Sequence, residues 1–572
     1  MPTLNWIGKE KVINHHQDVP FKILEPQYTF TNGKETKGAN SENKIIHGDN
    51  LEALKSLLPE YEGKINCIYI DPPYNTGNEE WKYNDNVNSP TIKKWLGKAV
   101  GKESEDLSRH DKWLCMMYPR LKLLHKLLAK ESVIFISIDD NEQASLKLVM
   151  DEIFGSNSFV TTLHVEMSSV QGQKVKFAKQ GSIVKNGEHI LIYKKSGKKN
   201  IAKKILYNLQ DYDTHYSIYL KKIDENNYLE IPLSQFIINE NKDIINHLLS
   251  IGLAKKSKNK ISLSNKNIAK AYSISDIFKE FIHKNAERIV ADDKVSSLSG
   301  LENLDLKKGE VKLVKKESRN YLLTINSNNN IRQRLILNEK IHKANDYYNT
   351  HGITTIRGDW WSGYYKDMGN VAKEGNTKFD NAKKPKRLIR DILYMTTDKN
   401  DIILDSFAGS GTTAHAVIDL NKEDNGNRKF ILVEMEDYAN EITSNRIKNV
   451  INDSKSGDFT YYELGGSLFL DNGFLNESVG LDKIHQYVWY SETKEPYKKE
   501  EENYLLGAKN DTAYYFYYQK DSITTLDESF LRSIKTKANQ YIIYADNCLL
   551  PQTIIDKYNI VFKKIPRDIT RF

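Results

Sequence analysis

The stretch CIYIDPPYNTGN (residues 67–78) places an acid, two prolines and an aromatic directly after a short apolar strand. Pro72 and Pro73 fix φ and lack backbone donors, so neither a strand nor a helix can continue through them. What remains is a stiff backbone that presents the Asp71 carboxylate, carbonyl oxygens and the Tyr74 ring. A strand that only had to turn would use Gly, Asn or Ser. The stretch therefore predicts an active site.

A second candidate site is the stretch DIILDSFAGSGTTAHAV (residues 401–417), which indicates a strand, a glycine loop and a helix. Gly409 and Gly411 permit a tight turn and close approach of the backbone to a ligand. Thr412 and Thr413 lie where the new helix exposes free N–H groups, which attract an anion. The loop therefore predicts an anion site.

Glu434 ends the next predicted strand, 23 residues after Gly411. In dinucleotide folds an acid at about this distance binds the ribose hydroxyls. The loop lacks the third glycine of GxGxxG and the GK[ST] of a P-loop, so a carboxylate fits it better than a pyrophosphate. S-adenosylmethionine carries both a ribose and a carboxylate. A purely structural strand–loop–helix unit remains an alternative, although Phe407 and Glu434 favour a ligand site.

The 572 residues exceed what one hydrophobic core can organise, so we expect several domains. Cys67, Cys115 and Cys548 lie far apart, which suggests neither a disulfide framework nor a zinc site. The N-terminal stretch has no apolar segment of signal-peptide length, and no run approaches a membrane-spanning helix. We therefore expect a cytoplasmic protein without a metal centre.

The elements that must position the two motifs alternate as strands and helices over residues 44–160, which predicts an α/β fold with a mostly parallel sheet. We expect Pro119 to start or kink a helix, Asp140 or Asn141 to cap the next helix, and Gly155 to end it. The α/β rhythm stops after a strand at residues 188–195 and returns near residue 385. The predicted domains are 1–195, 196–355, 356–480 and 481–572.

The predicted insertion, residues 196–355, carries 27 Lys and Arg against 18 Asp and Glu, a net charge of +9 in a chain whose total is +7. A basic segment between near-neutral flanks is typical of a surface that faces phosphates. The alternative is a Lys- and Asn-rich composition with solvated faces. Beyond this segment, Trp360 and Trp361 predict core packing, with contact to DNA or a base as the alternative.

The motifs DPPY and FAGSG together resemble the amino-methyltransferases of DNA, and their order around a basic insertion resembles the β class. This resemblance implies a Rossmann-like, circularly permuted S-adenosylmethionine-dependent methyltransferase sheet. It also implies an inserted target-recognition domain, with a small C-terminal α/β domain after the sheet. The implied catalytic roles are that Asp71 and the Pro72 carbonyl accept the two N–H bonds of the target amine, while Tyr74 stacks on the flipped base. Pro73 stiffens the motif.

The resemblance also implies a set of residues around S-adenosylmethionine. Glu434 would take the ribose, Asp49 would lie near the adenine, and Lys384 begins the helix before the cofactor loop. The full cofactor set is Asp49, Lys384, Asp405, Phe407, Gly409, Gly411, Thr412 and Glu434.

A narrower resemblance, to Mod subunits of type III restriction–modification systems, rests on WLCMMYPRLKLLHKLL, SVIFISIDDNEQASLKLVMDEIFG and the closing FKKIPRDITRF. It implies adenine-N6 methylation of duplex DNA by base flipping, a homodimer, and a separate helicase–nuclease restriction subunit as a possible partner. Three alternatives stay open. They are cytosine-N4 methylation, although those enzymes usually carry Ser or Thr where this chain has Asp71; a non-catalytic DNA specificity subunit; and an NAD-dependent oxidoreductase.

Overall fold

The computed structural model describes most of the chain as two compact units. One unit comprises residues 1–204 and 359–572, and the other comprises residues 205–358, where the sequence analysis placed the insertion at 196–355. The described residues are 3–76, 108–197, 200–258, 260–295, 304, 306–315, 320–377, 379, 383–470 and 472–567.

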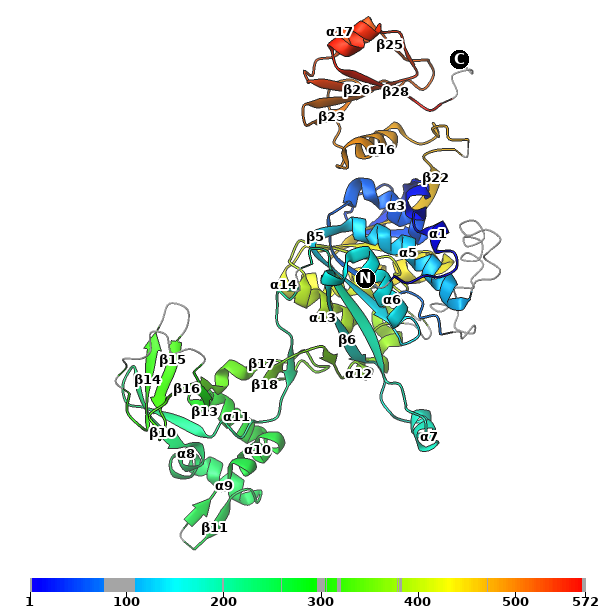
Figure 1. The fold of residues 1–572 in the computed structure, drawn as a ribbon. Helices are drawn as coiled ribbons and strands as arrows, with labels where there is room; N and C mark the ends of the chain where they lie inside the picture. The colour runs from blue at the N-terminus through cyan, green and yellow to red at the C-terminus, as the bar shows by residue number, and fades with distance from the viewer. Residues whose placement is uncertain are drawn as a thin grey trace. The chain divides into compact units, whose positions relative to one another are not determined.

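The first unit is built on an eleven-stranded sheet (Figure 1). Its middle, β5–β4–β20–β21–β3–β22, is parallel throughout, as the alternation of strands and helices predicts. Antiparallel pairs flank it on both sides, and the sequence analysis did not identify most of these outer strands. In spatial order the strands are β19 (Trp360–Trp361), β6 (Phe159–Glu166), β7 (Gly187–Lys194), β5 (Leu128–Ile138), β4 (Ile65–Ile70), β20 (Ile402–Asp405), β21 (Lys429–Glu434), β3 (Lys44–His47), β22 (Asp458–Ser467), β1 (Lys22–Thr31) and β2 (Lys34–Thr36).

Helices cover both faces of this sheet, so its middle strands are apolar on both sides. Ile68 and Ile70 of β4 pack in one core with α3, α5 and α6, whereas Cys67, the residue before Ile68, faces Thr396 of α13 across 4.0 Å. The principal helices of the unit are α1 (Lys9–Val12), α2 (His15–Asp18), α3 (Asn50–Tyr61), α5 (Arg109–Leu127), α6 (Gln143–Phe154), α7 (Gln173–Lys179), α12 (Tyr365–Met368), α13 (Lys386–Thr396), α14 (Thr412–Asp424) and α15 (Asn445–Ser454).

Two predictions about helix starts are wrong. Pro119 does not start a helix but lies inside α5, which begins ten residues earlier with a capping box between Ser108 and Asp111. Neither Asp140 nor Asn141 caps α6, because Glu142 is the N-cap residue and makes no side-chain cap. Instead, Asp140 pairs with Lys185 and His189 on the neighbouring strand and loop. The prediction that Gly155 ends α6 is confirmed, since it is the C-cap with φ of +86°.

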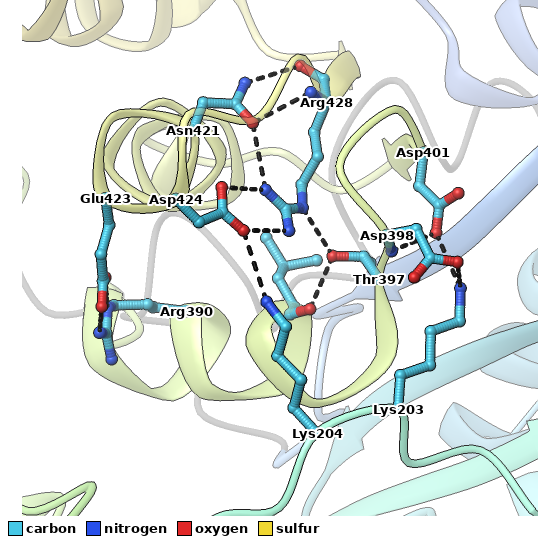
Figure 2. Close-up of polar contacts among 11 residues, drawn as sticks. Lys203, Lys204, Arg390, Thr397, Asp398, Asp401, Asn421, Glu423, Asp424 and Arg428 are labelled. Carbon is cyan, nitrogen blue, oxygen red and sulfur yellow. Dashed lines mark hydrogen bonds and ion pairs between the residues drawn. The ribbon is translucent and has the colours of Figure 1, made fainter. Parts of the chain in front are cut away.

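A buried arginine, Arg428, ties α14 to the start of β21 and to the end of α13 (Figure 2). Its guanidinium donates to both carboxylate oxygens of Asp424, at 2.9 and 2.8 Å, and to the Thr397 hydroxyl at 2.9 Å. Nearby, Lys203 pairs with Asp398 and Lys204 pairs with Asp424. These two lysines end the first segment of the unit, residues 1–204, and their ion pairs fix it beside α13 and α14.

The second unit contains a closed six-stranded barrel with the strand order β10–β14–β15–β16–β13–β9. Its strands and helices alternate less regularly than those of the sheet, which agrees with the loss of sequence rhythm. The elements are β8 (Tyr207–Leu209), β9 (Ile218–Lys222), β10 (Asn227–Pro232), α8 (Leu233–Glu240), α9 (Lys242–Ser250), β11 (Lys255–Ser257), β12 (Lys260–Ser262), α10 (Asn265–Ile274), α11 (Asp276–Asn285), β13 (Ile289–Lys294), β14 (Glu310–Lys315), β15 (Asn320–Ile325), β16 (Ile331–Ile336), β17 (Ile341–Lys343) and β18 (His351–Ile356).

The C-terminal part of the first unit adds a four-stranded sheet with the order β23–β24–β26–β28. The buried Arg567 guanidinium joins its tail to Asp546 and Glu477. The elements are α16 (Leu481–Thr493), β23 (Leu505–Lys509), β24 (Thr512–Phe516), β25 (Thr525–Leu526), α17 (Glu528–Ser533), β26 (Gln540–Ala545), β27 (Asn547–Cys548), α18 (Gln552–Lys557) and β28 (Ile560–Lys564). Among all described helices, none combines the length and apolarity that crossing a bilayer requires.

The two tryptophans next to the insertion have different environments. Trp361 is 1% exposed and lies against Tyr364, with ring centroids 6.0 Å apart, which confirms the prediction of core packing for this residue. Trp360 is 57% exposed, so the same prediction is wrong for its neighbour. Adjacent residues of a strand point to opposite sides, which explains the difference.

Candidate active site

Both sequence motifs follow the carboxyl ends of adjacent parallel strands. β4 pairs with β20 in the register Ile403↔Cys67 and Leu404↔Ile68, so the chain leaves both strands at the same edge of the sheet. β21, which ends at Glu434, and β3, which precedes Asp49, are the next two strands. The carboxyl edge of a parallel sheet is where open α/β folds bind ligands. The fold thus brings together residues more than 300 positions apart in the sequence.

The Asp71 carboxylate lies in a buried charge cluster with a lysine from the helix start near residue 385. The Lys384 ammonium is 3.3 Å from Asp71 Oδ1 and 2.8 Å from Glu188 Oε2 at the start of β7. It also donates to the Tyr74 hydroxyl at 2.6 Å, and it lies 4.6 Å from the centre of the Tyr74 ring. The Tyr74 hydroxyl in turn donates to Glu188 at 2.9 Å. One cation therefore joins the acid and the aromatic of the motif.

Burial and the charges within the cluster together set the pKa values of its members. It raises the pKa of Asp71; the Lys384 charge opposes this shift and the Glu188 charge adds to it. Burial also raises the pKa of Tyr74, and the Asp71 and Glu188 charges add to the shift. For Lys384, burial alone would lower the pKa, but the two carboxylates raise it above its ordinary value. The lysine is thus protonated at neutral pH and favours the ionised form of Asp71.

Two contacts outside the motif hold its backbone. The buried Trp113 of α5 donates its indole N–H to the Pro73 carbonyl at 2.7 Å. Asn75 adopts φ of +59° directly after Tyr74, and its side-chain amide donates to Glu142 and to the Arg109 carbonyl. Among the described residues, none donates a hydrogen bond to the Pro72 carbonyl.

The glycine loop is fixed by carboxylates on both sides. The Gly409 N–H donates to Glu434 at 2.7 Å. Asp405 accepts the Phe407 N–H at 3.0 Å and the Thr413 hydroxyl at 2.5 Å. Both acids are buried, and burial raises the pKa of each to about 7 against the opposing effect of these hydrogen bonds. Asp405 therefore shapes the loop, while Glu434 lies directly against it.

The loop has room for a ligand on one side. Gly409 has φ of +51°, and a Cβ at this position would meet no atom within 4 Å, whereas one at Gly411 would approach Thr443 at 3.3 Å. Gly411 also has φ of +81° and is the N-cap of α14, so a side chain at either glycine would be strained. The backbone can thus approach a ligand at Gly409.

Arg446 of α15 lies behind the loop, and the sequence analysis did not identify it. Its guanidinium is fully buried and donates to the Ser410 hydroxyl at 2.7 Å and the Thr412 hydroxyl at 2.9 Å. It pairs with Glu374 at 3.3 Å. His415 lies against the same guanidinium, and burial, aided by the Lys386 and Arg446 charges, lowers the pKa of this imidazole to about 2. Thr412 is therefore engaged in a buried network as well as lying beside the loop.

Asp49 lies at the carboxyl edge of the parallel sheet, after β3, and its side chain caps a helix there. Its Oδ1 accepts the N–H groups of Leu51 and Glu52 at 2.8 and 3.2 Å, so it caps α3. Its second oxygen lies 3.6 Å from the buried Arg120 guanidinium. Asn50, the next residue, donates to the Ser406 carbonyl at 3.2 Å and joins this helix start to the glycine loop.

Three residues that the sequence analysis missed thus complete the site: Trp113, Glu188 and Arg446. Glu188 is the first residue of the apolar strand predicted at 188–195, which was a weak signal for a carboxylate at this edge of the sheet. Trp113 and Arg446 lie inside helices whose pattern gave no sign of the contact they make. Among the described residues, no group of three His, Cys, Asp or Glu side chains could hold a metal ion.

Comparison with known protein families places the chain in a known class. The family model of N6_N4 DNA methylases matches residues 65–446, which covers both motifs, and the chain belongs to this family. The chain is 30% identical over 489 residues to the type III restriction–modification enzyme EcoPI Mod subunit of Escherichia phage P1 (79% of this chain, 68% of that protein).

Two further relatives match a similar share of this chain. The chain is 30% identical over 440 residues to the probable type III enzyme HindVI Mod subunit of Haemophilus influenzae (74% of this chain, 52% of that protein). It is 28% identical over 406 residues to the type II methyltransferase M.KpnI of Klebsiella pneumoniae (69% of this chain, 81% of that protein). The chain thus spans between about half and two thirds of the two Mod subunits.

Proposed function

We propose that the chain is an S-adenosylmethionine-dependent DNA methyltransferase that modifies N6 of adenine. The observation that carries this proposal is the strand pairing β4–β20, which puts Asp71-Pro72-Pro73-Tyr74 beside the glycine loop of Phe407–Gly411. An acceptor pair and an aromatic ring then lie at the same sheet edge as the glycine loop. Membership in the DNA methylase family agrees with this reading.

The residues present fit S-adenosylmethionine. Glu434 offers a carboxylate for ribose hydroxyls, because its two oxygens accept two backbone N–H bonds and retain further lone pairs. Gly409 leaves open space on one side, and the partly buried Phe407 ring lies beside it. We propose that Phe407, Gly409, Gly411 and Glu434 contact this cofactor directly, and that Asp405 and Thr412 shape the loop. When bound, the cofactor supplies an electrophilic methyl group on a sulfonium.

The protein's own contribution is to make the target nitrogen nucleophilic. The exocyclic amine of adenine is a poor nucleophile because its lone pair is delocalised into the ring. We propose that Asp71 and the Pro72 carbonyl accept its two N–H bonds, which localises the lone pair. Fixed acceptors of this kind usually supply the largest catalytic contribution. Lys384 keeps Asp71 ionised, and Trp113 keeps the proline backbone rigid.

Tyr74 is proposed to stack on the target base. A base inside a duplex cannot reach a buried carboxylate, so it must flip out at a cost of a few kcal/mol. Stacking on an aromatic ring offsets about 1–3 kcal/mol of this cost. Lys384 and Glu188 fix the Tyr74 hydroxyl and thereby the ring plane.

Residues 205–358 are proposed to recognise the DNA sequence. Besides its excess of basic residues, this unit has a hollow of about 890 Å³ at its barrel. Among the side chains that line it are donors and rings suited to phosphates and base edges, namely Lys222, Tyr228, Arg288, Asn320, Tyr321 and Gln333.

The experiment is to incubate the purified chain with unmethylated duplex DNA and S-adenosylmethionine, then digest the DNA and identify modified nucleosides by mass spectrometry. We expect N6-methyladenine, and none with the Asp71→Asn variant. N4-methylcytosine would overturn the adenine assignment. Absence of any methylated nucleoside with the unmodified chain would support a non-catalytic specificity subunit instead, and an unchanged product level with Asp71→Asn would contradict the role proposed for Asp71.

We further propose that the chain acts as a Mod subunit of a type III system, as a homodimer that can associate with a restriction subunit. The identity to two Mod subunits supports this assignment, and the match to M.KpnI leaves a solitary methyltransferase as the alternative. Light scattering of the purified chain tests the dimer. Co-purification with a co-expressed helicase–nuclease subunit tests the partner, and methylation without any such association would favour the solitary enzyme.

A further inference from the structure

The connection between β6 and β7, residues 167–186, forms an arm that leaves the sheet at its active-site edge. β6 is antiparallel to β7, β7 is antiparallel to β5, and β5 is parallel to β4, so β6 and β4 end at the same edge. The arm rejoins the sheet one residue before Glu188, which contacts Tyr74 and Lys384. Figure 1 shows α7 at the tip of this arm, beyond the ends of both strands.

The base of the arm is held in place, whereas its tip is open. The N–H groups of Met167 and Ser168 both donate to the Asn186 carbonyl, at 2.9 and 3.2 Å. Lys174 donates to the Ser168 hydroxyl and to the Lys185 carbonyl. Lys185 pairs with Asp140 at 2.7 Å, which fixes the arm to the loop after β5. Beyond these contacts, residues 176–183 are all exposed.

The tip combines positive charge with apolar side chains that have no evident function in the folded chain. The arm contains four lysines and no acidic residue, and Lys176 and Lys179 are among its exposed residues. Phe177 is 53% exposed, Val170 is 47% exposed and Ile183 is 97% exposed. Stability of the chain does not explain an isoleucine in water on a lysine-rich arm, since its burial would be favourable.

We propose that the tip of this arm binds duplex DNA next to the target base, with Lys176 and Lys179 on phosphates and Phe177 and Ile183 against the bases. This inference rests on the proposed function, because a base that reaches Tyr74 requires the duplex to lie over this sheet edge. Lysines neutralise phosphates, and apolar side chains can wedge between base steps and help to unstack them. A second copy of the arm is a poor partner, because two acid-free, lysine-bearing tips repel each other.

The charge component is tested by measuring DNA affinity of the full chain over a series of salt concentrations. Lys176→Ala with Lys179→Ala is expected to reduce the slope of log affinity against log salt by about 2, since each phosphate contact contributes about 0.9. The matched control is Lys520→Ala with Lys537→Ala, two exposed lysines of the C-terminal part, which should leave the slope unchanged. An unchanged slope in the arm variant would overturn the proposal.

The apolar component is tested with 2-aminopurine at the target adenine, whose fluorescence rises when the base leaves the stack. Phe177→Ser with Ile183→Ser is expected to lower this signal and the methylation rate at least tenfold, with unchanged S-adenosylmethionine affinity. Leu549→Ser, at a residue that is 75% exposed in the C-terminal part, is the control for loss of a surface apolar group. All these side chains are exposed, so the variants should fold.

The outcomes separate this proposal from the assignment of function. If the unmodified chain transfers no methyl group to any DNA, the proposed function fails. If it methylates DNA and both arm variants keep the salt slope and the 2-aminopurine signal, only the arm proposal fails. If Phe177→Ser with Ile183→Ser instead converts a dimer into a monomer with an unchanged salt slope, the arm is a self-association surface and the proposal is wrong.

Discussion

The Lys384 ammonium lies 3.3 Å from the Asp71 carboxylate, although 313 positions separate the two residues in the chain. Lys384 precedes α13, and Asp71 follows β4. The contact joins the start of the helix before the glycine loop to the Asp71–Tyr74 motif, and Lys384 also contacts Glu188 of β7 at 2.8 Å. One lysine thus contacts both the buried Asp71 carboxylate and the partly buried Glu188 carboxylate.

Lys384→Met should shift the pH dependence of methylation upward. Without the ammonium, burial and the neighbouring Glu188 charge are opposed less and raise the pKa of Asp71 further. The ionised acceptor then forms only at higher pH, so the acid limb of single-turnover methyl transfer should move upward. Lys384→Arg, which keeps the charge, should restore most of the profile. An unchanged limb in Lys384→Met would contradict the coupling.

Tyr74→Phe and Tyr74→Ala should separate the hydroxyl from the ring. The Phe variant keeps the stacking surface and loses only the contacts to Lys384 and Glu188, so we expect a small increase in the KM for DNA. The Ala variant loses the stacking itself, about 1–3 kcal/mol per base, and should lower the rate by one to two orders of magnitude. Steady-state kinetics of both variants separate the contribution of the hydroxyl from that of the ring. Equal losses would show that the hydroxyl matters as much as the ring.

Arg446→Met should weaken cofactor binding, whereas Arg428→Met should not. Both guanidinium groups are fully buried and paired with a carboxylate, so each substitution should destabilise the fold by about 3–5 kcal/mol. Only Arg446 contacts the hydroxyls of Ser410 and Thr412 in the loop. We expect roughly a tenfold loss of S-adenosylmethionine affinity, equivalent to about 1.4 kcal/mol, for Arg446→Met alone. Thermal unfolding first establishes that both variants are folded at the assay temperature. Calorimetry then compares their affinities for S-adenosylmethionine.

Asp405 and Glu434 should make the cofactor-free protein less stable as pH rises from about 4 to about 7. Burial raises the pKa of each to about 7, so the folded state binds more protons than the unfolded state in this window. Stability then falls with pH by at most about 1.4 kcal/mol per pH unit for each group and levels off above pH 7. Asp405→Asn and Glu434→Gln should each flatten the decline. Denaturant unfolding at several pH values measures the slope, and a rise with pH attributable to either residue would contradict the assignment.

The strands and helices next to the two motifs could be predicted from local pattern alone. KINCIYI and DIILDSF are short apolar runs bounded by breakers, and the structure has β4 and β20 there. Glu434 was expected at a strand end and lies there. Alternation of strands and helices predicted a parallel sheet, and parallel topology in turn places all strand carboxyl ends at one edge.

Other features depend on contacts that no local pattern encodes. Asp140 looked like a helix cap because an acid at a strand-to-helix junction usually is one, yet Lys185 and His189 compete for it from β7 and the arm. The outer antiparallel strands β1, β2 and β6 are short or half-exposed, and their alternation is weaker than that of buried strands.

The sequence by itself determined the chemistry: a proline-stiffened acid and ring, a glycine loop, and a carboxylate after the following strand. Covalent geometry and side-chain type set these properties, and both are local. Only the tertiary structure decided which cation faces Asp71, which arginine supports the loop, and where the lysine-bearing arm emerges. Those choices follow from strand order and helix packing, because burial makes each charge depend on the neighbours that the fold supplies from distant parts of the chain.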